Sequence, residues 1–155
     1  QSNFQLLACY MKSLKKFLIS EPFETHRFGY KMTVMVAPYG DAQVARQYLS
    51  IYVTLIKGDY DAILRWPFTH PMTFTAHAVN PSEDLVRKFI PNPIPQNLPF
   101  LGRPTTRNAA FGIQRFCKLM DVDKYIIEGD FFLSVHIDLS LLDRERTPRM
   151  PADDL

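Results

Sequence analysis

Apolar and polar residues alternate along several short stretches of the chain, a period of two that is typical of β-strands with one buried face. The clearest stretch covers residues 131–139, in which every odd-numbered residue is apolar. Weaker versions of the same pattern cover residues 30–37, 48–56, 72–79 and 111–116. The pattern therefore predicts at least five strands, each with one face turned to a core.

Turn-forming residues separate these stretches. Proline, glycine, asparagine and aspartate occupy the gaps at residues 38–41, 57–59, 80–82 and 91–99. Residues 14–19 have a weak helical pattern, and residues 41–47 could form one helical turn that Asp41 would cap. Many short strands with frequent turns predict an all-β fold, an antiparallel β-sandwich.

Length and composition predict one folded domain. The chain has 155 residues, of which 46% are hydrophobic, and a chain of this size buries roughly 68–70% of its unfolded surface without metal or disulfide staples. We expect the domain to span residues 1–142. Residues 143–155 are charged and include two prolines, so we expect a disordered tail without function. Because the chain begins with Gln1 and not Met, we expect a fragment of a longer protein.

Charge and residue spacing argue against several classes of partner. The net charge is +2 and no dense block of lysine or arginine occurs, which disfavours nucleic acid. No apolar run reaches the roughly 18–20 residues of a membrane span, and no signal peptide is recognisable. Cys9 and Cys117 form no C-x-x-C pair, the histidines lack a zinc-ligand spacing, and the glycines are isolated. We therefore expect a cytoplasmic protein without metal, cofactor or disulfide.

Nucleophilic catalysis has one candidate pair in the sequence. Cys117 with His136 is the only combination of nucleophile and base that we can identify, and no nucleophile-elbow glycine pattern surrounds Cys117. A lone cysteine beside apolar residues is more often a buried structural residue. The sequence thus predicts a protein that is not an enzyme.

Aromatic residues are more numerous than the inward-facing strand positions can take. Tyr48, Tyr52, Phe89, Phe100 and Phe111 do not all fit a core pattern. They could plug the core and its loops. Alternatively, they could wall a shallow groove in which a peptide lays its side chains and pairs its backbone with a sheet edge. The pattern alone leaves both interpretations open.

Three motifs follow one another in order along the first half of the chain. They are SEPFETHRFGYKM at residues 20–32, YLSIY at 48–52 and GDYDAILRWPF at 58–68. They resemble the S-P-x-F-Y-T-x-x-Y-G-Y-K-M, H-L-S-L-F and G-x-x-D-A-L-L-x-W-P-F motifs of the C-terminal TRAF or MATH domain of the TNF receptor-associated factors. YIIEGD at 125–130 is similar to the family's Y-I-K-D-D. The pairs Arg107-Asn108 and Phe111-Gly112 favour the branch that contains factors four and six.

The resemblance implies an eight-stranded antiparallel β-sandwich and a non-catalytic adaptor domain. Family members bind short extended peptides from receptor cytoplasmic tails or adaptor proteins. The peptide would run along the edge strand that contains Phe111 and Gly112, and Tyr52, Phe89 and Phe100 match residues that wall an apolar pocket. The resemblance also implies a full-length homotrimer held by a preceding coiled coil, for which residues 14–19 are too short.

Departures from the family concern the polar end of this site. Met35 stands where the family has a basic residue, and Ala37 stands where it has a tyrosine, whereas Asp41 matches a loop aspartate. A peptide carboxylate would find no basic partner at Met35 or Ala37, so we expect a more apolar ligand. The same departures support an alternative function, an assembly module that has lost peptide binding. A stable trimer of this chain in sedimentation would favour that alternative.

Overall fold

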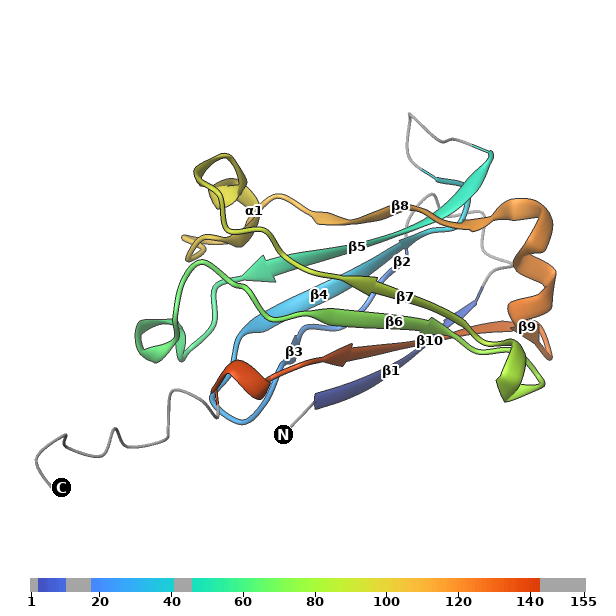
Figure 1. Ribbon diagram of the computed structural model, residues 1–155, viewed down its shortest axis with the longest axis horizontal. Helices are drawn as coiled ribbons and strands as arrows, with labels where there is room; N and C mark the ends of the chain where they lie inside the picture. The colour runs from blue at the N-terminus through green and yellow to red at the C-terminus, as the bar shows by residue number, and fades with distance from the viewer. Residues whose placement is uncertain (1–2, 11–17, 41–45, 143–155) are drawn as a thin grey trace, which may run out of the picture.

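The computed structural model describes residues 3–10, 18–40 and 46–142, with the backbone alone for residues 3–10. Strands dominate this part of the chain and lie in two layers (Figure 1). The two layers are called sheet A and sheet B below.

Sheet A has the strand order β1-β10-β6-β7, and every pairing in it is antiparallel. A two-residue strand, β9 (Ile126–Ile127), pairs with the beginning of β10. The four main strands are β1 (Asn3–Tyr10), β10 (Asp130–Ile137), β6 (Met72–Ala76) and β7 (Leu85–Phe89). Because β7 ends this order, one of its sides is a sheet edge.

Sheet B has the order β2-β4-β5-β8, with β3 also paired to β4. Its strands are β2 (Leu18–Ile19), β3 (Phe23–Glu24), β4 (Lys31–Ala37), β5 (Tyr48–Ile56) and β8 (Phe111–Lys118). Both short strands lie antiparallel to β4, and Pro22, which has no N–H, separates them. Counted as one interrupted strand, β2 and β3 complete four strands in this sheet. Within the described residues, the predicted eight-stranded antiparallel sandwich is therefore confirmed, with β9 as an addition.

Short helical turns connect the strands. Most are 3₁₀ turns: η1 (Asp61–Ile63), η2 (Pro81–Glu83), η3 (Pro95–Asn97) and η4 (Leu119–Tyr125). One four-residue α-helix, α1 (Leu98–Leu101), follows η3 directly. Together η3 and α1 form a projection at one end of the sandwich (Figure 1).

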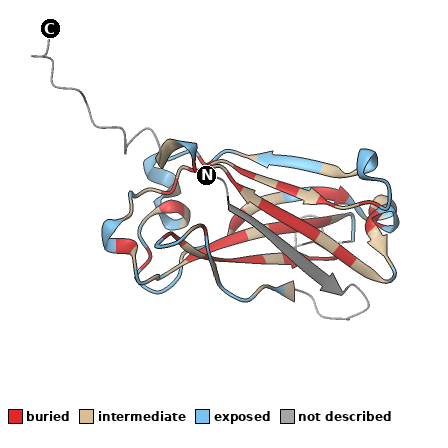
Figure 2. Ribbon diagram, turned by 90° about the horizontal axis from the view of Figure 1, so that it is seen from below, coloured by how far each residue is buried: buried red, intermediate tan, exposed pale blue. Residues whose placement is uncertain are grey.

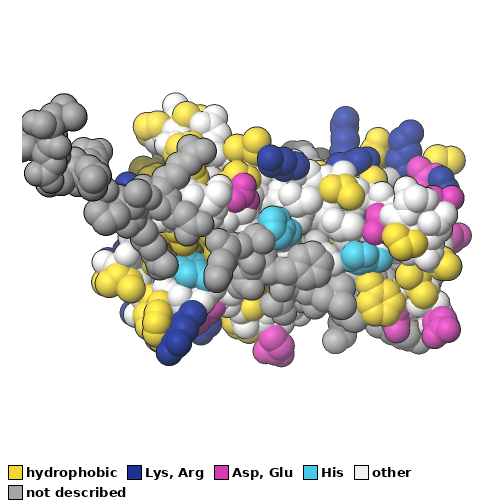
Figure 3. Space-filling model, turned by 60° about the horizontal axis from the view of Figure 1, so that its bottom comes forward, with side chains coloured by type: hydrophobic (Ala, Val, Ile, Leu, Met, Phe, Trp, Pro, Cys, Tyr) yellow, Lys and Arg dark blue, Asp and Glu magenta, His cyan; other side chains and the backbone are white. Residues whose placement is uncertain are grey.

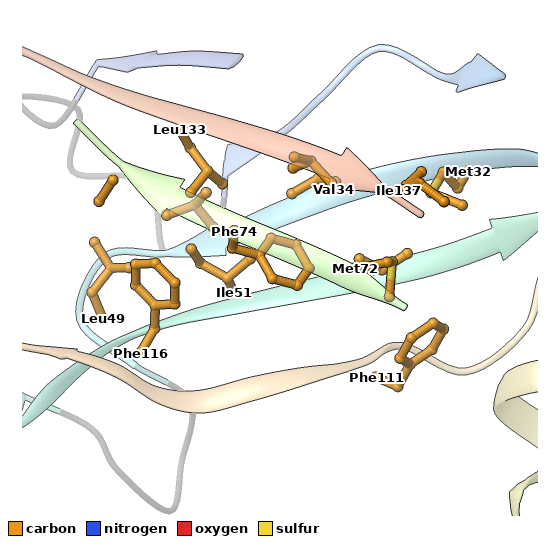
Figure 4. Packing of buried hydrophobic residues seen from close by; sticks show 14 of the residues in the cluster. Met32, Val34, Leu49, Ile51, Met72, Phe74, Phe111, Phe116, Leu133 and Ile137 are labelled. Atoms are coloured by element: carbon orange, nitrogen blue, oxygen red, sulfur yellow. The ribbon is translucent and has the colours of Figure 1, made fainter. Parts of the chain in front are cut away.

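The core fills the space between the two sheets. Leu49, Ile51 and Val53 of β5 are fully buried, and so are Phe74 of β6 and Leu133 of β10. Figure 4 shows these layers interdigitating, and Figure 2 shows that buried residues line the inner faces of both sheets. Apolar burial of this kind, worth about 25 cal/mol per Å², is the main force that holds the sheets together.

The W-P-F motif forms a second packed cluster beside the core. The Tyr30 ring lies 4.9 Å from the Phe68 ring and 5.0 Å from the Trp66 ring, both edge to face. Trp66 Nε1 donates to the backbone oxygen of Asp61 at 2.9 Å, and the Asp61 carboxylate accepts from Gly58 N at 3.0 Å. The Asp61 side chain thereby closes the turn that begins at Gly58.

Several expectations about individual elements need correction. Leu18–Ile19 is a strand and not the end of a helix, because Leu18 pairs with Val36 of β4; the rest of the expected helix at 14–19 lies outside the described residues. Of the expected turn at 41–47, only Arg46 and Gln47 are described, and both lie in a hydrogen-bonded turn. Residues 5–8, for which the sequence predicted no strand, belong to β1.

The strand β7 was missed for a physical reason. Only Leu85 and Phe89 at its ends are half-buried, whereas Val86, Arg87 and Lys88 between them are exposed. An edge strand that buries so little apolar surface shows no alternation to detect.

Candidate functional site

The outer side of β8 is open. Within the described part of the chain, β8 pairs only with β5, and its other edge carries no partner strand. β7, the edge strand of sheet A, lies on the same side of the sandwich (Figure 1). An edge of this kind presents backbone N–H and C=O groups that can pair with a strand from another molecule.

One row of residues crosses sheet B next to this edge. Met35 of β4 pairs with Tyr52 of β5, and Tyr52 pairs with Gly112 of β8. Met35 and Tyr52 are half-buried, and they alternate with residues buried in the core, so their side chains face outward. This row gives the outer face of sheet B an apolar and aromatic surface beside the open strand.

Ala37 does not contribute to this surface, although it was predicted to do so. Ala37 is fully buried and therefore offers no accessible surface to a ligand. Its neighbour across the ladder, Ser50, is also fully buried. Asp41 lies outside the described residues.

A pocket of about 160 Å³ opens at the end of the β8 edge. The aromatic residues that line it come from three elements: Phe89 ends β7, Phe100 belongs to α1 and Phe111 begins β8. The rings of Phe89 and Phe111 lie 5.5 Å apart. Gly112 also lines the pocket, so the pocket and the row across sheet B meet at this glycine. Four of the predicted residues are thus together in one place.

The pocket wall that α1 provides is held by hydrogen bonds from two segments. Asn108 Nδ2 donates to Phe100 O at 3.2 Å and to Gly102 O at 2.7 Å. Phe68 N donates to Leu101 O at 2.8 Å. Because Phe68 belongs to the W-P-F motif, this motif also fixes the position of the wall.

The sequence did not show that Asn92 and Asn97 converge on the polar side of the pocket. Asn92 and Asn97 line it beside Pro91 and Leu101, and Asn97 Nδ2 donates to Asn92 O at 2.9 Å. These residues lie in a proline-rich stretch without periodicity, where the sequence marks a turn but does not determine which side chains converge.

A bulge interrupts the pairing of β8 with β5. Leu49 pairs with Cys117 and Ile51 pairs with Ile113, so three residues of β8 lie opposite the single residue Ser50. The Ser50 hydroxyl donates to Gln114 O at 2.6 Å across this gap. A bulge bends an edge strand and limits how far an added strand can follow it.

A scan against protein-family models matches residues 15–134 to the family described as TRAF/meprin, MATH domain. This match covers most of the chain, including β8 and the pocket. The chain belongs to this family. Known MATH domains therefore share its evolutionary origin, and the predicted resemblance is confirmed.

Individual relatives agree with the family match. The chain is 30% identical over 127 residues to human TNF receptor-associated factor 2, covering 79% of this chain and 25% of that protein. It is 28% identical over 131 residues to human TNF receptor-associated factor 5, covering 81% of this chain and 23% of the relative. The chain thus spans about a quarter of these relatives. The solved structure of Notothenia coriiceps TRAF5 superposes with a TM-score of 0.78 at 25% identity, covering 88% of this chain and 73% of that chain.

The branch of the family stays a prediction. The relatives named above are factors 2 and 5, and murine factor 1 is 28% identical over 79% of this MATH domain and 31% of its own length. They do not include factors four and six, which the pairs Arg107-Asn108 and Phe111-Gly112 favour.

The nucleophile and base considered in the sequence lie on different sheets. Cys117 is on β8 and packs in the core, whereas His136 is on β10 and alternates with core residues of sheet A. Burial raises the pKa of the Cys117 thiol to about 11, with Asp121 adding to the effect. The thiol is therefore protonated at neutral pH.

We expect Cys117 to react slowly with a thiol reagent in the folded protein. In a Cys9→Ala background, the rate with a disulfide reagent at pH 7.5 should be at least tenfold lower in the folded protein than in urea, since only the thiolate attacks. The rate should rise steeply only as the pH approaches the raised pKa of this thiol. Rapid stoichiometric labelling at pH 7.5 would contradict the burial of this residue.

A serine, a histidine and an aspartate that the sequence analysis did not connect meet on the outer face of sheet A. His77 Nε2 contacts the Ser134 hydroxyl, and His77 Nδ1 lies 3.4 Å from the Asp84 carboxylate. Histidine side chains come to the surface on the face seen in Figure 3. Ser134, however, is only 1% exposed and lies mid-strand in β10, with ladder partners on both sides. The arrangement links the loop after β6 to β10, and the Ser134 hydroxyl is not accessible as a nucleophile.

No helix among the described residues is long and apolar enough to cross a membrane. No group of three or more histidine, cysteine, aspartate or glutamate side chains among them could hold a metal ion.

Proposed function

We propose that this MATH domain is a non-catalytic protein-interaction domain that binds short extended peptides from receptor cytoplasmic tails or adaptor proteins in signalling. The observation that carries the proposal is the junction at Gly112, where an open strand edge meets an aromatic pocket. A peptide backbone would pair with β8, and one apolar side chain would enter the pocket.

The chemistry of the surface favours an apolar peptide residue beside the row across sheet B. Met35 offers no charge there, so a carboxylate placed against it would lose its hydration without gaining a cationic partner. The polar wall of Asn92 and Asn97 suits an uncharged group at the mouth of the pocket. At this position the site therefore differs from one in which a basic residue binds a peptide carboxylate.

Two properties of the whole protein follow from the resemblance and remain proposals. One is homotrimerisation through a coiled coil that precedes the domain. The other is a cytoplasmic location.

Replacing Phe89 by alanine tests the pocket. We expect the affinity for a peptide selected from an array of eight-residue sequences to fall about five- to tenfold, because truncating a buried aromatic anchor costs at least about 1 kcal/mol. Binding is measured by the chemical-shift changes of backbone amides. Val86→Ala is the matched control, because Val86 lies on the same strand and is 53% exposed. If no array peptide shifts the amides of Phe89, Phe100 or Gly112, the proposal is wrong.

A further inference from the structure

Three cationic residues lie near one tyrosine, Tyr48, at the end of β8 that lies away from the pocket. The Arg115 guanidinium lies 5.8 Å from the centre of the Tyr48 ring. Lys118 is the ladder partner of Tyr48. Arg46, Tyr48 and Lys118 line a hollow of about 350 Å³. Arg46, Tyr48, Arg115 and Lys118 are called the cationic cluster below.

The cationic cluster lies on the same face of sheet B as the row of Met35, Tyr52 and Gly112. This row and the pocket beside it are called the groove below. Leu49 and Ile51 of β5 point into the core, so Tyr48 and Tyr52 both point outward from sheet B. The Arg115 guanidinium lies over the outward Tyr48 ring, so it is on the same face of sheet B. A ligand that lies along β8 at Gly112 would therefore meet the cationic cluster if it continued in the direction of Lys118.

The three cations are available to a ligand. Arg46, Arg115 and Lys118 are all exposed. The ion pairs between described residues are His77 with Asp84 and Lys124 with Asp121, and none of them uses a cation of the cluster. Asp121, the acidic residue closest in sequence to Lys118, is thus already paired with Lys124 at 3.8 Å.

The bulge explains why charge would be needed at this end. Backbone pairing with an added strand can follow β8 from Gly112 only to the irregular residues opposite Ser50. Beyond them, side-chain attraction has to replace the ladder. Arginine held over an aromatic ring is well suited to this, because the ring orients the guanidinium and leaves its N–H donors free for carboxylates.

We propose that the cationic cluster is a second subsite for the same peptide, and that it binds aspartate or glutamate side chains. The proposal rests on the peptide-binding function inferred above and adds a charge requirement to it. Gly112 pairs with Tyr52 and Lys118 pairs with Tyr48, and the four-residue step between the two tyrosines spans about 13 Å of extended chain. The acidic residues should therefore lie about four to six positions from the residue that enters the pocket.

The first experiment tests the cationic cluster with a ligand that has no apolar side chain for the pocket. Hexaglutamate is titrated into the isotope-labelled chain at 50 mM NaCl, with hexaglutamine as the uncharged control. We expect hexaglutamate alone to shift the amides of Arg46, Tyr48, Arg115 and Lys118, and the shifts to shrink at least threefold at 300 mM NaCl. Equal shifts with hexaglutamine, or shifts spread evenly over all basic residues, would overturn the proposal.

Charge reversal supplies the matched comparison. Arg115→Glu with Lys118→Glu should abolish the hexaglutamate shifts, whereas Lys57→Glu with Arg107→Glu, an equal change of two exposed residues at the opposite end of β5, should leave them intact. Arg115→Gln with Lys118→Gln is the milder variant, should the reversal disturb folding, and it should weaken the shifts at least threefold. Unchanged shifts in a folded variant of this pair would refute the subsite.

The second experiment links the two subsites. An array-selected peptide that binds at Gly112 is extended by two glutamates four to six residues from its apolar anchor. We expect the extension to tighten binding five- to tenfold in the native chain and less than twofold in the Arg115→Glu and Lys118→Glu variant. If no array peptide binds at Gly112, the proposed peptide binding in the groove is wrong. The hexaglutamate titration still shows whether the cationic cluster binds acidic side chains. Binding to phosphatidylserine vesicles without any response to hexaglutamate would replace the peptide by a membrane surface and overturn the proposal.

Discussion

Replacing Gly112 by alanine is expected to destabilise the sandwich and to abolish peptide binding at the β8 edge. A Cβ added at this position would lie 2.1 Å from Ile51 O and 2.8 Å from Tyr52 Cα. Both are backbone atoms of β5, so no side-chain rotation relieves the clash and β8 has to move away from β5. Overpacking of this kind costs about 1–3 kcal/mol. We expect the free energy of unfolding, measured in urea, to fall by an amount in this range.

The functional consequence of Gly112→Ala should exceed its effect on stability. Gly112 lies in the row that contains Tyr52 and also lines the pocket, so a displaced β8 disturbs both halves of the groove. We expect at least a tenfold loss of peptide affinity in protein that remains folded. Gly58→Ala is the control, because its added Cβ would meet side-chain atoms of Lys31 and Asp61 at 3.0 and 3.2 Å. Equal peptide affinity in the native chain and Gly112→Ala would contradict the close approach of β8 to β5.

Replacing Phe68 by alanine should produce the largest loss of stability. The Phe68 side chain is fully buried and packs edge to face on Tyr30 at 4.9 Å and on His70 at 5.3 Å. Removing a buried phenylalanine costs about 3–5 kcal/mol, because the transfer energy is lost and a cavity remains. Urea unfolding followed by fluorescence measures this change.

The same substitution should loosen the pocket. Phe68 N donates a hydrogen bond to Leu101 O, so repacking around the W-P-F motif should displace α1 and with it the pocket wall that contains Phe100. We expect the amides of Phe100 and Leu101 to exchange with solvent faster in Phe68→Ala. Phe28→Ala is the matched control, since the Phe28 ring is 45% exposed, and it should cost less than about 1 kcal/mol. A loss for Phe68→Ala no larger than for the control would show that this cluster does not support the fold.

Alternation of apolar residues predicted the central strands well and the edges poorly. β5 and β10 each have neighbours on both sides and bury one complete face, so their odd-numbered residues carry a clear period of two. β7 buries only its two ends. β2 and β3 contribute two residues each around Pro22. An edge strand forms because a neighbouring strand pairs with it, and the alternation of apolar residues within the edge strand does not show which strand is its neighbour.

The candidate site was predictable only where it coincides with strands. Tyr52 and Gly112 were identified through the family motifs, and the ladder places them side by side. The convergence of Asn92 and Asn97 depends on the loop before α1, in which Asn97 donates to Asn92 O. It also depends on the position of α1, which is set by hydrogen bonds from Asn108 and from the distant Phe68. The cationic cluster was missed for a similar reason, since Arg46 and Lys118 are 72 positions apart and meet only because β5 pairs with β8.

Contacts between a bound peptide and the β8 backbone test the central claim most directly. With an unlabelled array-selected peptide and the isotope-labelled chain, filtered nuclear Overhauser spectra report which amides lie within about 5 Å of the peptide backbone, because antiparallel partners bring their Cα atoms to about 4.5–5.5 Å. We predict regular cross-strand contacts from the peptide to residues 112–114, together with side-chain contacts to Phe89 and Phe100. A peptide that binds with all its contacts on β7, or on the outer face of sheet A, would contradict the account.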